Sequence, residues 1–193
     1  SSDKAATPRS VMGATKRLAE LVVTAGADSS FQPIVIRFGN VLGSSGSVLT
    51  IMRQSIRAGQ PVPLTDPAAT RYFMTAGEAV SLVIKAERLS RRTETYWLDM
   101  GQPVAIGELA RRLMRIEEAA GYAPVPLQVI GLRPGEKLRE ELTAQGIRMC
   151  RTSHPRIWVA RQAAGDPAAM AQTVRRLRNR VARGDAGGTL TEL

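Results

Sequence analysis

The chain has 193 residues, 44% of them hydrophobic and only 4% aromatic, and its formal net charge at pH 7 is +10. This composition is sufficient for a mainly aliphatic core and excludes a disordered tail. Cys150 is the single cysteine, which excludes an internal disulfide, and His154 is the single histidine, so we expect no metal site.

The positive charge comes mainly from arginine, since 23 of the 27 basic residues are Arg. Such a balance suits nucleic acid, an anionic membrane or a phosphorylated substrate as a partner. The sequence contains no zinc-finger spacing and no aromatic run of the RNA-recognition type. We therefore expect no nucleic-acid partner and interpret most arginines as solvated surface residues.

The first part of the chain predicts a helix followed by a buried strand. Thr7 and Pro8 are typical of a helix start, and Gly26 marks the expected end. The run Pro33–Val41 is short and rich in β-branched residues, which indicates a strand. Apolar residues recur at helical spacing along this helix, namely Val11, Ala14, Leu18, Leu21 and Val22.

Turn and cap signals divide the middle of the chain. The glycine- and serine-rich stretch 43–47 is a predicted loop, and Ser47 caps a predicted helix over residues 48–58. Two short strands are expected on either side of a turn at Asp66 and Pro67.

A capping box at Thr75–Glu78 predicts the start of another helix. The apolar face expected on that helix consists of Ala79, Val80, Val83 and Ile84. The remaining expected elements are strands at 95–100, 126–131 and 156–161, a helix over 107–120, a loop running into a helix over 132–142, and a final helix capped by Asp166.

The alternation of strands and amphipathic helices indicates an α/β sheet. The expected strands are too few for a complete doubly wound domain, and no Gly-x-Gly-x-x-Gly turn follows a strand. The stretch 43–47 lacks a downstream acid at the distance needed to bind a ribose. We therefore expect the chain to be a piece of a longer protein.

Several stretches carry a resemblance that covers residues 1 to about 155. They read, in order, SSDKA, VMGATKR, RFGNVLGSSGSV, TRYFMT, LDMGQPV and GLRPGEKL. These stretches closely resemble the nucleotide-sugar 4,6-dehydratases of polysaccharide biosynthesis, which are extended short-chain dehydrogenase/reductase proteins typified by UDP-N-acetylglucosamine 4,6-dehydratase.

The resemblance implies an α/β fold, specifically an incomplete Rossmann-like extended short-chain dehydrogenase fold. It covers the family's carboxyl-terminal portion, so the first dinucleotide-binding strands and the Gly-rich turn are expected upstream of Ser1. Residues 1–161 are then the catalytic and substrate-binding portion, and residues 162–193 are a basic amphipathic helix and tail.

The family's reaction explains the residue types at the start of the chain. Such an enzyme oxidises a UDP-N-acetylhexosamine at C4 with tightly bound, recycled NAD, eliminates the C6 hydroxyl, and returns the hydride to C6. The elimination needs a base at C5 and an acid at O6. By resemblance Asp3 is the acid and Lys4 the base. Burial favours the neutral forms of both groups, while their mutual attraction favours the charged forms, and the sequence leaves this balance open.

Met12 and Lys16 have the spacing of the Tyr-x-x-x-Lys pair of the wider superfamily. By resemblance Lys16 binds the nicotinamide ribose, while Met12 stands where a catalytic tyrosine is usual. One branch of these dehydratases, which is membrane-attached, carries Met at this position. The deprotonation of O4 then passes to another group, with Ser2, Asp3 and water as the alternatives.

Three further residues are candidates for binding the nucleotide sugar. Arg71 and Arg133 suit the UDP pyrophosphate, because a guanidinium presents a planar fork to phosphate oxygens and keeps its charge. By resemblance both hold the UDP, and Asn40 hydrogen-bonds the substrate near the sugar and phosphates.

The arginines of the tail are interpreted as the solvated face of a packed terminal helix, with contact to anionic lipid as the alternative. The apolar stripe of this helix consists of Met170, Val174, Leu177 and Val181, and its basic residues are Arg175, Arg176, Arg178, Arg180 and Arg183.

Two other functions remain open at this point. A nucleotide-sugar 4-epimerase shares the fold and cofactor, but it normally needs the tyrosine and has no use for an Asp-Lys pair. A non-catalytic nucleotide-sugar-binding or membrane-binding module is the other alternative. The resemblance also implies a cytoplasmic protein, attached to the inner membrane through an upstream segment, that acts in making capsule, O-antigen or another surface glycan. The sequence leaves the oligomeric state open, with a homo-oligomer as one option.

Overall fold

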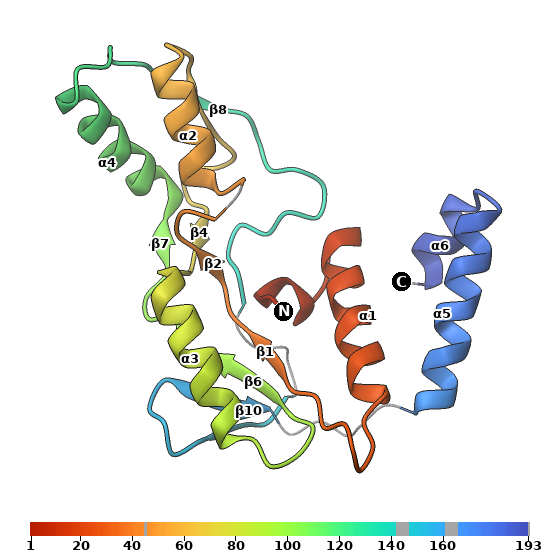
Figure 1. The fold of residues 1–193 in the computed structure, drawn as a ribbon. Coiled ribbons are helices and arrows are strands. Elements are labelled where there is room, and N and C mark those ends of the chain that lie inside the picture. The colour runs from red at the N-terminus through yellow and green to blue at the C-terminus, as the bar shows by residue number, and fades with distance from the viewer. Residues whose placement is uncertain (45, 142–146, 161–165, 193) are drawn as a thin grey trace. The chain divides into compact units, whose positions relative to one another are not determined.

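The computed structural model describes residues 1–44, 46–141, 147–160 and 166–192. The chain divides into two compact units (Figure 1). Unit 1 consists of Ser1–Phe38, Leu82–Asp99 and Glu141–Leu193, and unit 2 of Gly39–Ser81 and Met100–Glu140. The sequence analysis predicted a different boundary, at residue 161, between the part that resembles the family and the basic tail. The two compact units do not test that boundary, so it stays a prediction.

Unit 1 is built on a mixed four-stranded sheet with the order β1-β6-β10-β9. β1 pairs with β6 in parallel, and β10 lies antiparallel to both β6 and β9. All four residues of β6 are buried, as expected for the middle of a sheet that is covered on both faces. The strands are β1 Val35–Arg37, β6 Thr95–Leu98, β9 Met149–Arg151 and β10 Ile157–Ala160.

Apart from the second half of α3 (Ala76–Leu89), the described helices of unit 1 come from the two ends of the chain. The 3-10 helix η1 (Asp3–Ala5) precedes α1 (Val11–Ala25), and α5 (Pro167–Ala182) precedes α6 (Ala186–Glu192). Figure 1 shows α1 and α5 side by side, in agreement with their contact. The prediction that Asp166 caps the terminal helix is confirmed, because its carboxylate accepts the Ala168 N–H.

Helix α1 begins later than the sequence predicted. Ser10 caps it, since its hydroxyl accepts the Gly13 N–H at 3.2 Å, so the expected start at Thr7 and Pro8 was wrong. Of the apolar residues that recur at helical spacing, Val11 and Val22 are exposed. The buried residues of α1 are instead Gly13, Glu20 and Ala25.

Unit 2 consists of short strands in three separate pairs. β2 pairs with β5 and β3 with β8, both in parallel, and β4 pairs with β7 antiparallel. The two strands expected around Asp66 are therefore present, but each pairs with a different strand. The bounds are β2 Asn40–Val41, β3 Val62–Leu64, β4 Thr70–Arg71, β5 Phe73–Met74, β7 Val104–Ala105 and β8 Leu127–Val129.

The strand expected over Pro33–Val41 is interrupted. Its first part is β1 in unit 1, and its second part is β2 in unit 2. Gly39 lies at the break, where a Cβ atom would be 3.0 Å from the Tyr72 carbonyl oxygen and 3.1 Å from the Tyr72 Cβ. A glycine is therefore needed for the backbone to pass Tyr72 at this distance.

The core of unit 2 lies between α2 (Val48–Arg57), α4 (Ile106–Ala119) and β3. Ser47 caps α2 through the Thr50 N–H, as predicted. The Glu117 side chain of α4 is 4% exposed and accepts the Nε–H groups of Arg53 and Arg57 at 2.8 Å each. The apolar residues of this core are Met52, Ile56, Val62, Leu64, Ala69, Ile106, Ala110, Leu113 and Val125.

Helix α3 (Ala76–Leu89) has the predicted capping box, in which Thr75 and Glu78 exchange hydrogen bonds. Its predicted apolar face was wrong in part, because Val80 and Ile84 are exposed. The fully buried residues of α3 are Ala79, Leu82 and Ala86. Of these three, Ala79 belonged to the predicted face, whereas Leu82 and Ala86 did not.

The segment after Ile130 forms turns and a bridge, not a helix, as far as Glu141. Thr70 is paired with Arg139 there, and the Thr70 N–H donates to the Leu138 carbonyl at 3.0 Å. The helix predicted over 132–142 is therefore wrong up to residue 141, and residue 142 lies outside the described residues.

Among the described residues, no helix is both long enough and apolar enough to cross a membrane. The parallel strand pairs joined by helices agree with the expected α/β class.

Gly13 provides a stability test of the contact between α1 and the start of the chain. A Cβ atom at Gly13 would lie 2.8 Å from the Lys4 carbonyl oxygen and 3.3 Å from Pro8. We expect Gly13→Ala to lower the free energy of unfolding by about 1–3 kcal/mol because of this overpacking. Gly77→Ala in α3 is the control, since no atom lies within 4 Å of that position. Urea unfolding curves that rank the two variants equally would contradict the close contact.

Candidate functional site

Ser2, Asp3 and Lys4 form a compact polar group at the start of unit 1. Ser2 caps η1, because its hydroxyl accepts the Lys4 N–H at 3.1 Å. The Asp3 side chain is 0% exposed, and its Oδ1 atom accepts the Ser2 hydroxyl and the Lys4 ammonium, both at 3.0 Å. The structure therefore brings together three of the residues predicted to be catalytic.

The second carboxylate oxygen of Asp3 is buried and has no hydrogen-bond partner among the described residues. A buried polar atom without a partner is costly, so it is an unusual feature that calls for an explanation. Asp3 thus has one oxygen in an ion pair and one oxygen available to another group. This arrangement is suitable for a group that transfers a proton.

Backbone contacts fix the position of this polar group. The Asp3 N–H donates to the Phe38 carbonyl at 3.2 Å, and Ser2 is bridged to Phe38 in parallel. On the other side, the Lys4 carbonyl lies against Gly13 in the first turn of α1. Strand β1 and helix α1 therefore hold the segment from two directions.

Met12 and Lys16 lie on α1, and both side chains are exposed among the described residues. They are four residues apart, so they are neighbours on one helix face. Glu20 follows at the same interval and is buried. The structure thus places Lys16 one helical turn from both Met12 and a buried carboxylate.

Glu20 belongs to a charged network that the sequence analysis did not identify. Its Oε1 atom accepts the Arg37 Nε–H at 2.8 Å, its Oε2 atom accepts Arg37 Nη2, and Arg17 adds a bond at 3.0 Å. The Arg37 guanidinium also lies 4.9 Å from the centre of the Trp97 ring. Burial raises the pKa of the Glu20 carboxyl, but its hydrogen bonds, foremost those from Arg37, outweigh burial and hold that pKa below its ordinary value.

Asn40, Arg71 and Arg133 all belong to unit 2. The Asn40 backbone N–H and side-chain amide both donate to the Tyr72 carbonyl, at 2.9 and 3.2 Å. Asn40 therefore fixes the backbone of the β4–β5 region through Tyr72. Its predicted contact with the substrate stays a prediction.

Arg71 makes more internal contacts than the predicted role in phosphate binding suggests. Its Nη1 atom donates to the Thr70 and Leu138 carbonyls at 2.8 and 3.2 Å. Its Nη2 atom is 2.9 Å from Glu136 and its Nε atom 3.5 Å from Glu140. A guanidinium has five N–H donors, so most of them are already directed at protein groups.

Arg133 differs from Arg71 because its side chain is exposed. Its backbone N–H donates to Glu136 at 3.3 Å, which anchors the start of this loop to the carboxylate that also holds Arg71. Of the two arginines, Arg133 is thus the one whose guanidinium faces solvent.

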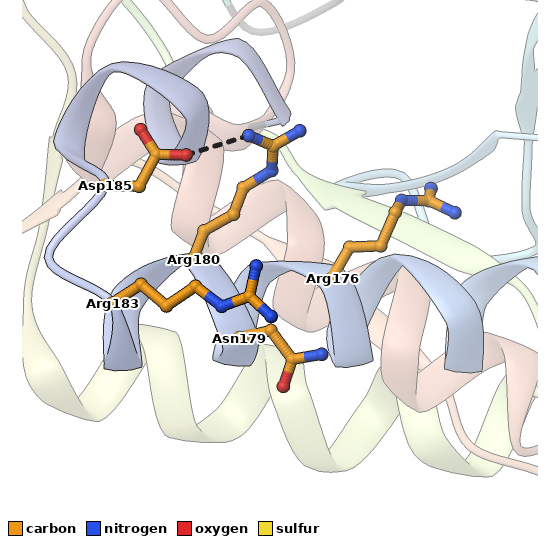
Figure 2. Close-up of a pocket in the computed structure, with 5 residues that line it drawn as sticks. All are labelled: Arg176, Asn179, Arg180, Arg183 and Asp185. Atoms are coloured by element: carbon orange, nitrogen blue, oxygen red, sulfur yellow. Dashed lines mark hydrogen bonds and ion pairs between the residues drawn. The ribbon is translucent and has the colours of Figure 1, made fainter.

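Three arginines of the tail, Arg176, Arg180 and Arg183, line a surface hollow of about 310 Å³ in unit 1. Figure 2 shows Arg176, Arg180 and Arg183 on one face of α5, with Arg180 paired to Asp185 at 3.0 Å. Leu177 is buried on a different face, and Val181 is exposed, so the expected apolar stripe is covered only in part. This basic face lies outside the stretches that carry the family resemblance.

Residues 1–162 match the family described as "Polysaccharide biosynthesis protein". The chain belongs to this family. It is 45% identical over 169 residues to the probable polysaccharide biosynthesis protein EpsC of Bacillus subtilis (strain 168), covering 86% of this chain and 28% of that protein. It is 47% identical over 146 residues to the capsular polysaccharide biosynthesis protein CapD of Staphylococcus aureus, covering 74% of this chain and 24% of that protein.

Other comparisons extend beyond these two relatives. A UDP-glucose 4-epimerase of Rickettsia canadensis is 32% identical, over 75% of this chain and 42% of that protein. Among solved structures, Pen from Bacillus thuringiensis superposes with a TM-score of 0.75 at 25% identity, over 91% of this chain and 60% of that chain. The chain spans only about a quarter of the length of EpsC and of CapD.

These similarities identify a nucleotide-sugar-modifying short-chain dehydrogenase family and its Rossmann-like fold. The predicted family and α/β fold class are confirmed. The roles of individual site residues stay predictions, for Ser2, Asp3, Lys4, Met12 and Lys16 as for the residues of unit 2.

The sequence analysis missed four charged residues: Glu136 and Glu140, which pair with Arg71, and Glu20 and Arg37, which pair with each other. One signal was available for Glu20, since it repeats the Met12–Lys16 interval along the family's helix. A second signal was Arg37, because an arginine inside a β-branched strand must have a partner if it is buried.

Substitution of Arg71 tests whether this arginine stabilises the folded protein. Its side chain is 11% exposed and that of Glu140 only 4%, so Arg71→Ala leaves a buried carboxylate without this partner. We expect a loss of about 3–5 kcal/mol in the free energy of unfolding, measured by urea denaturation. Arg133→Ala, at an exposed position, is expected to change it by less than about 0.5 kcal/mol. Equal losses would show that Arg71 does not organise this segment.

Proposed function

We propose that the full-length protein catalyses the NAD-dependent 4,6-dehydration of a UDP-N-acetylhexosamine to a 4-keto-6-deoxy sugar for a surface glycan. The observation that carries the proposal is the buried Asp3, joined to Lys4 at 3.0 Å and next to the first turn of α1. An acid and a base in contact are what an elimination across C5 and C6 requires.

The Asp3–Lys4 pair has the number of protons that the elimination needs. Transfer of one proton along the 3.0 Å contact turns carboxylate and ammonium into carboxylic acid and amine. The Lys4 amine then removes the C5 proton, the C6–O6 bond breaks, and the Asp3 carboxyl gives its proton to O6, which leaves as water. The two residues return to the ion pair that the structure contains. When Lys4 gives its proton back to C5, the proton released from O4 during the oxidation restores the ion pair.

Lys16 is the residue of this chain that would hold the cofactor. NAD, when bound, accepts the C4 hydride and returns it to C6. The exposed ammonium of Lys16 is free of any ion pair among the described residues and lies one turn from Met12, which suits hydrogen bonds to ribose hydroxyls. The thioether of Met12 cannot accept a proton at O4, so Ser2, Asp3 or water takes that role.

The nucleotide is assigned to unit 2. Arg133 and Arg71 bind the UDP phosphates, with Arg133 offering its exposed fork and Arg71 its remaining N–H. Asn40 supports the sugar side through the backbone it holds at Tyr72.

A 4-epimerase is the second candidate, because the relative from Rickettsia canadensis has that name. Two features favour dehydration over it. Met12 replaces the usual tyrosine, and the Asp3–Lys4 pair has no role in a reaction confined to C4. Attachment to the cytoplasmic face of the inner membrane through a segment outside this chain, and assembly into a homo-oligomer, belong to the same proposal and rest on the family resemblance.

The product distinguishes the two reactions. We expect the full-length protein to convert UDP-N-acetylglucosamine, followed by NMR in D2O, to a keto sugar with a C6 methyl group and deuterium at C5. The 193-residue chain alone is expected to be inactive, because its sequence has no Gly-rich dinucleotide turn. Formation of the C4 epimer without a methyl signal would establish the alternative.

Lys4→Ala tests the base in the full-length protein. We expect loss of deuterium incorporation at C5 and of the methyl product, since general base catalysis contributes about 10²- to 10⁴-fold. UDP affinity, measured by calorimetry, should stay within about twofold because Lys4 is assigned to the sugar. Unchanged C5 exchange would remove Lys4 from the mechanism.

Arg133→Ala tests the placement of the nucleotide. Removal of one guanidinium from a phosphate contact that is desolvated in the complex is expected to weaken UDP binding by at least about tenfold. Arg175→Ala is the control, since an exposed arginine on α5 acts only through a screened field. Equal losses in the two variants would mean that the arginines act as diffuse charge.

A further inference from the structure

We propose that the buried ion pair of Glu20 and Arg37 positions Lys16 relative to Asp3 and Lys4 for the reaction. Neither residue was assigned a role by the sequence or by the comparisons. The inference rests on the proposed function for the identity of the reacting groups, and it is argued from contacts within unit 1 alone.

Glu20 shares one face of α1 with Met12 and Lys16. Met12, Lys16 and Glu20 follow one another at intervals of four residues, which is about one turn each. Glu20 is the buried member of this row, whereas Met12 and Lys16 are exposed. The contact of Glu20 with Arg37 therefore fixes both the rotation of α1 about its axis and the position of Lys16 along that axis.

Arg37 is the last residue of strand β1. Phe38 follows directly, and its carbonyl accepts the Asp3 N–H at 3.2 Å. Ser2 is bridged to the same residue. The backbone that holds the Arg37 side chain thus also holds the Asp3–Lys4 segment, only one residue away.

The geometry of the pair is directional. Arg37 presents Nε and Nη2 to the two oxygens of Glu20, a fork-to-fork arrangement that fixes distance and orientation together. Trp97 lies against the guanidinium and restricts its plane. A lysine or a hydrophobic pair of the same volume could fill this space but could not impose the same angle.

The pair is not the arrangement expected if stability were its only role. The Arg37 side chain is 1% exposed, yet its Nη1 atom has no hydrogen-bond partner among the described residues. A buried donor without a partner opposes folding, and buried ion pairs contribute little stability compared with apolar packing. Directional positioning of α1 against β1 explains why a charged pair lies here.

Glu117 provides a matched control within the same chain. Its side chain is also 4% exposed and also accepts two arginines, from Arg53 and Arg57. It lies in unit 2, whereas Ser2, Asp3, Lys4, Met12 and Lys16 all lie in unit 1. The effect of neutralising a buried carboxylate can thus be compared at Glu20, in the same unit as Asp3 and Lys4, and at Glu117, in the other unit.

The experiment uses the full-length protein with Glu20→Gln, Arg37→Lys and Glu117→Gln. We expect Glu20→Gln and Arg37→Lys to lower kcat and the rate of C5 deuterium exchange by about 10- to 100-fold, because small misplacements of reacting groups are costly. KM and UDP affinity should stay within about twofold. Glu117→Gln should keep kcat within about twofold at temperatures below its Tm.

Glu20→Asp keeps the charge and tests the geometry if Glu20→Gln does not fold. We expect this variant to fold and to bind UDP normally but to have a lower kcat, since the aspartate side chain is shorter by one methylene and places its carboxylate differently. Dehydration by the wild type together with unaltered kcat in the Glu20 and Arg37 variants would overturn the positioning role alone. Equal falls in kcat for Glu20→Gln and Glu117→Gln would assign both pairs to stability and overturn it as well.

The outcome for the wild type separates this inference from the proposed function. A wild-type protein that epimerises without dehydrating overturns only the dehydratase proposal, and the same variants are then compared through the kcat of that reaction. A wild-type protein that converts no nucleotide sugar overturns both.

Discussion

The backbone from Arg37 to Asn40 must satisfy several close contacts at once, and the candidate residues depend on it. Arg37 reaches Glu20 on α1, and the next carbonyl, of Phe38, accepts the Asp3 N–H. Gly39 then passes the Tyr72 carbonyl at a distance that a side chain would prevent, and Asn40 donates to that same carbonyl. The contacts of Arg37 and Phe38 hold α1 and η1, and those of Gly39 and Asn40 hold the backbone at Tyr72, so a substitution in these four residues affects more than one element. This constraint explains why the strand stops at Arg37 instead of continuing to Val41.

Carboxylates hold arginines in both units, although the chain has 27 basic and only 17 acidic residues. Glu20, Glu117 and Glu140 are all buried, and each forms an ion pair with at least one guanidinium. A buried carboxylate is tolerated only with such partners, so the scarce acids determine which arginines are structural. The remaining arginines, including most of those on α5, stay at the surface and supply the positive field. Net charge alone therefore describes the surface of this protein but not the part of its charge that orders the fold.

Local signals in the sequence were sufficient wherever the structure depends on neighbouring residues. Ser47, Thr75 and Asp166 cap helices as predicted, since a cap needs only a side chain and an N–H group two or three positions away. Contacts between distant residues could not be predicted in this way. The pair Glu20 and Arg37 is separated by 17 positions, and the carboxylates that hold Arg71 by 65 or more. The family resemblance supplied the site residues but not the network that supports them.

The proposed dehydration also constrains how the protein manages without a tyrosine. Oxidation at C4 releases the O4 proton, and elimination consumes one proton at O6, so the reaction balances when the first replaces the second. Ser2 and Lys4 both donate to Asp3 Oδ1 at 3.0 Å, while Oδ2 is buried without a partner among the described residues. A carboxyl group arranged in this way can receive a proton through one set of contacts and give it up at the other oxygen. Loss of the tyrosine at position 12 is then compatible with catalysis, because proton release and proton supply meet at one buried side chain.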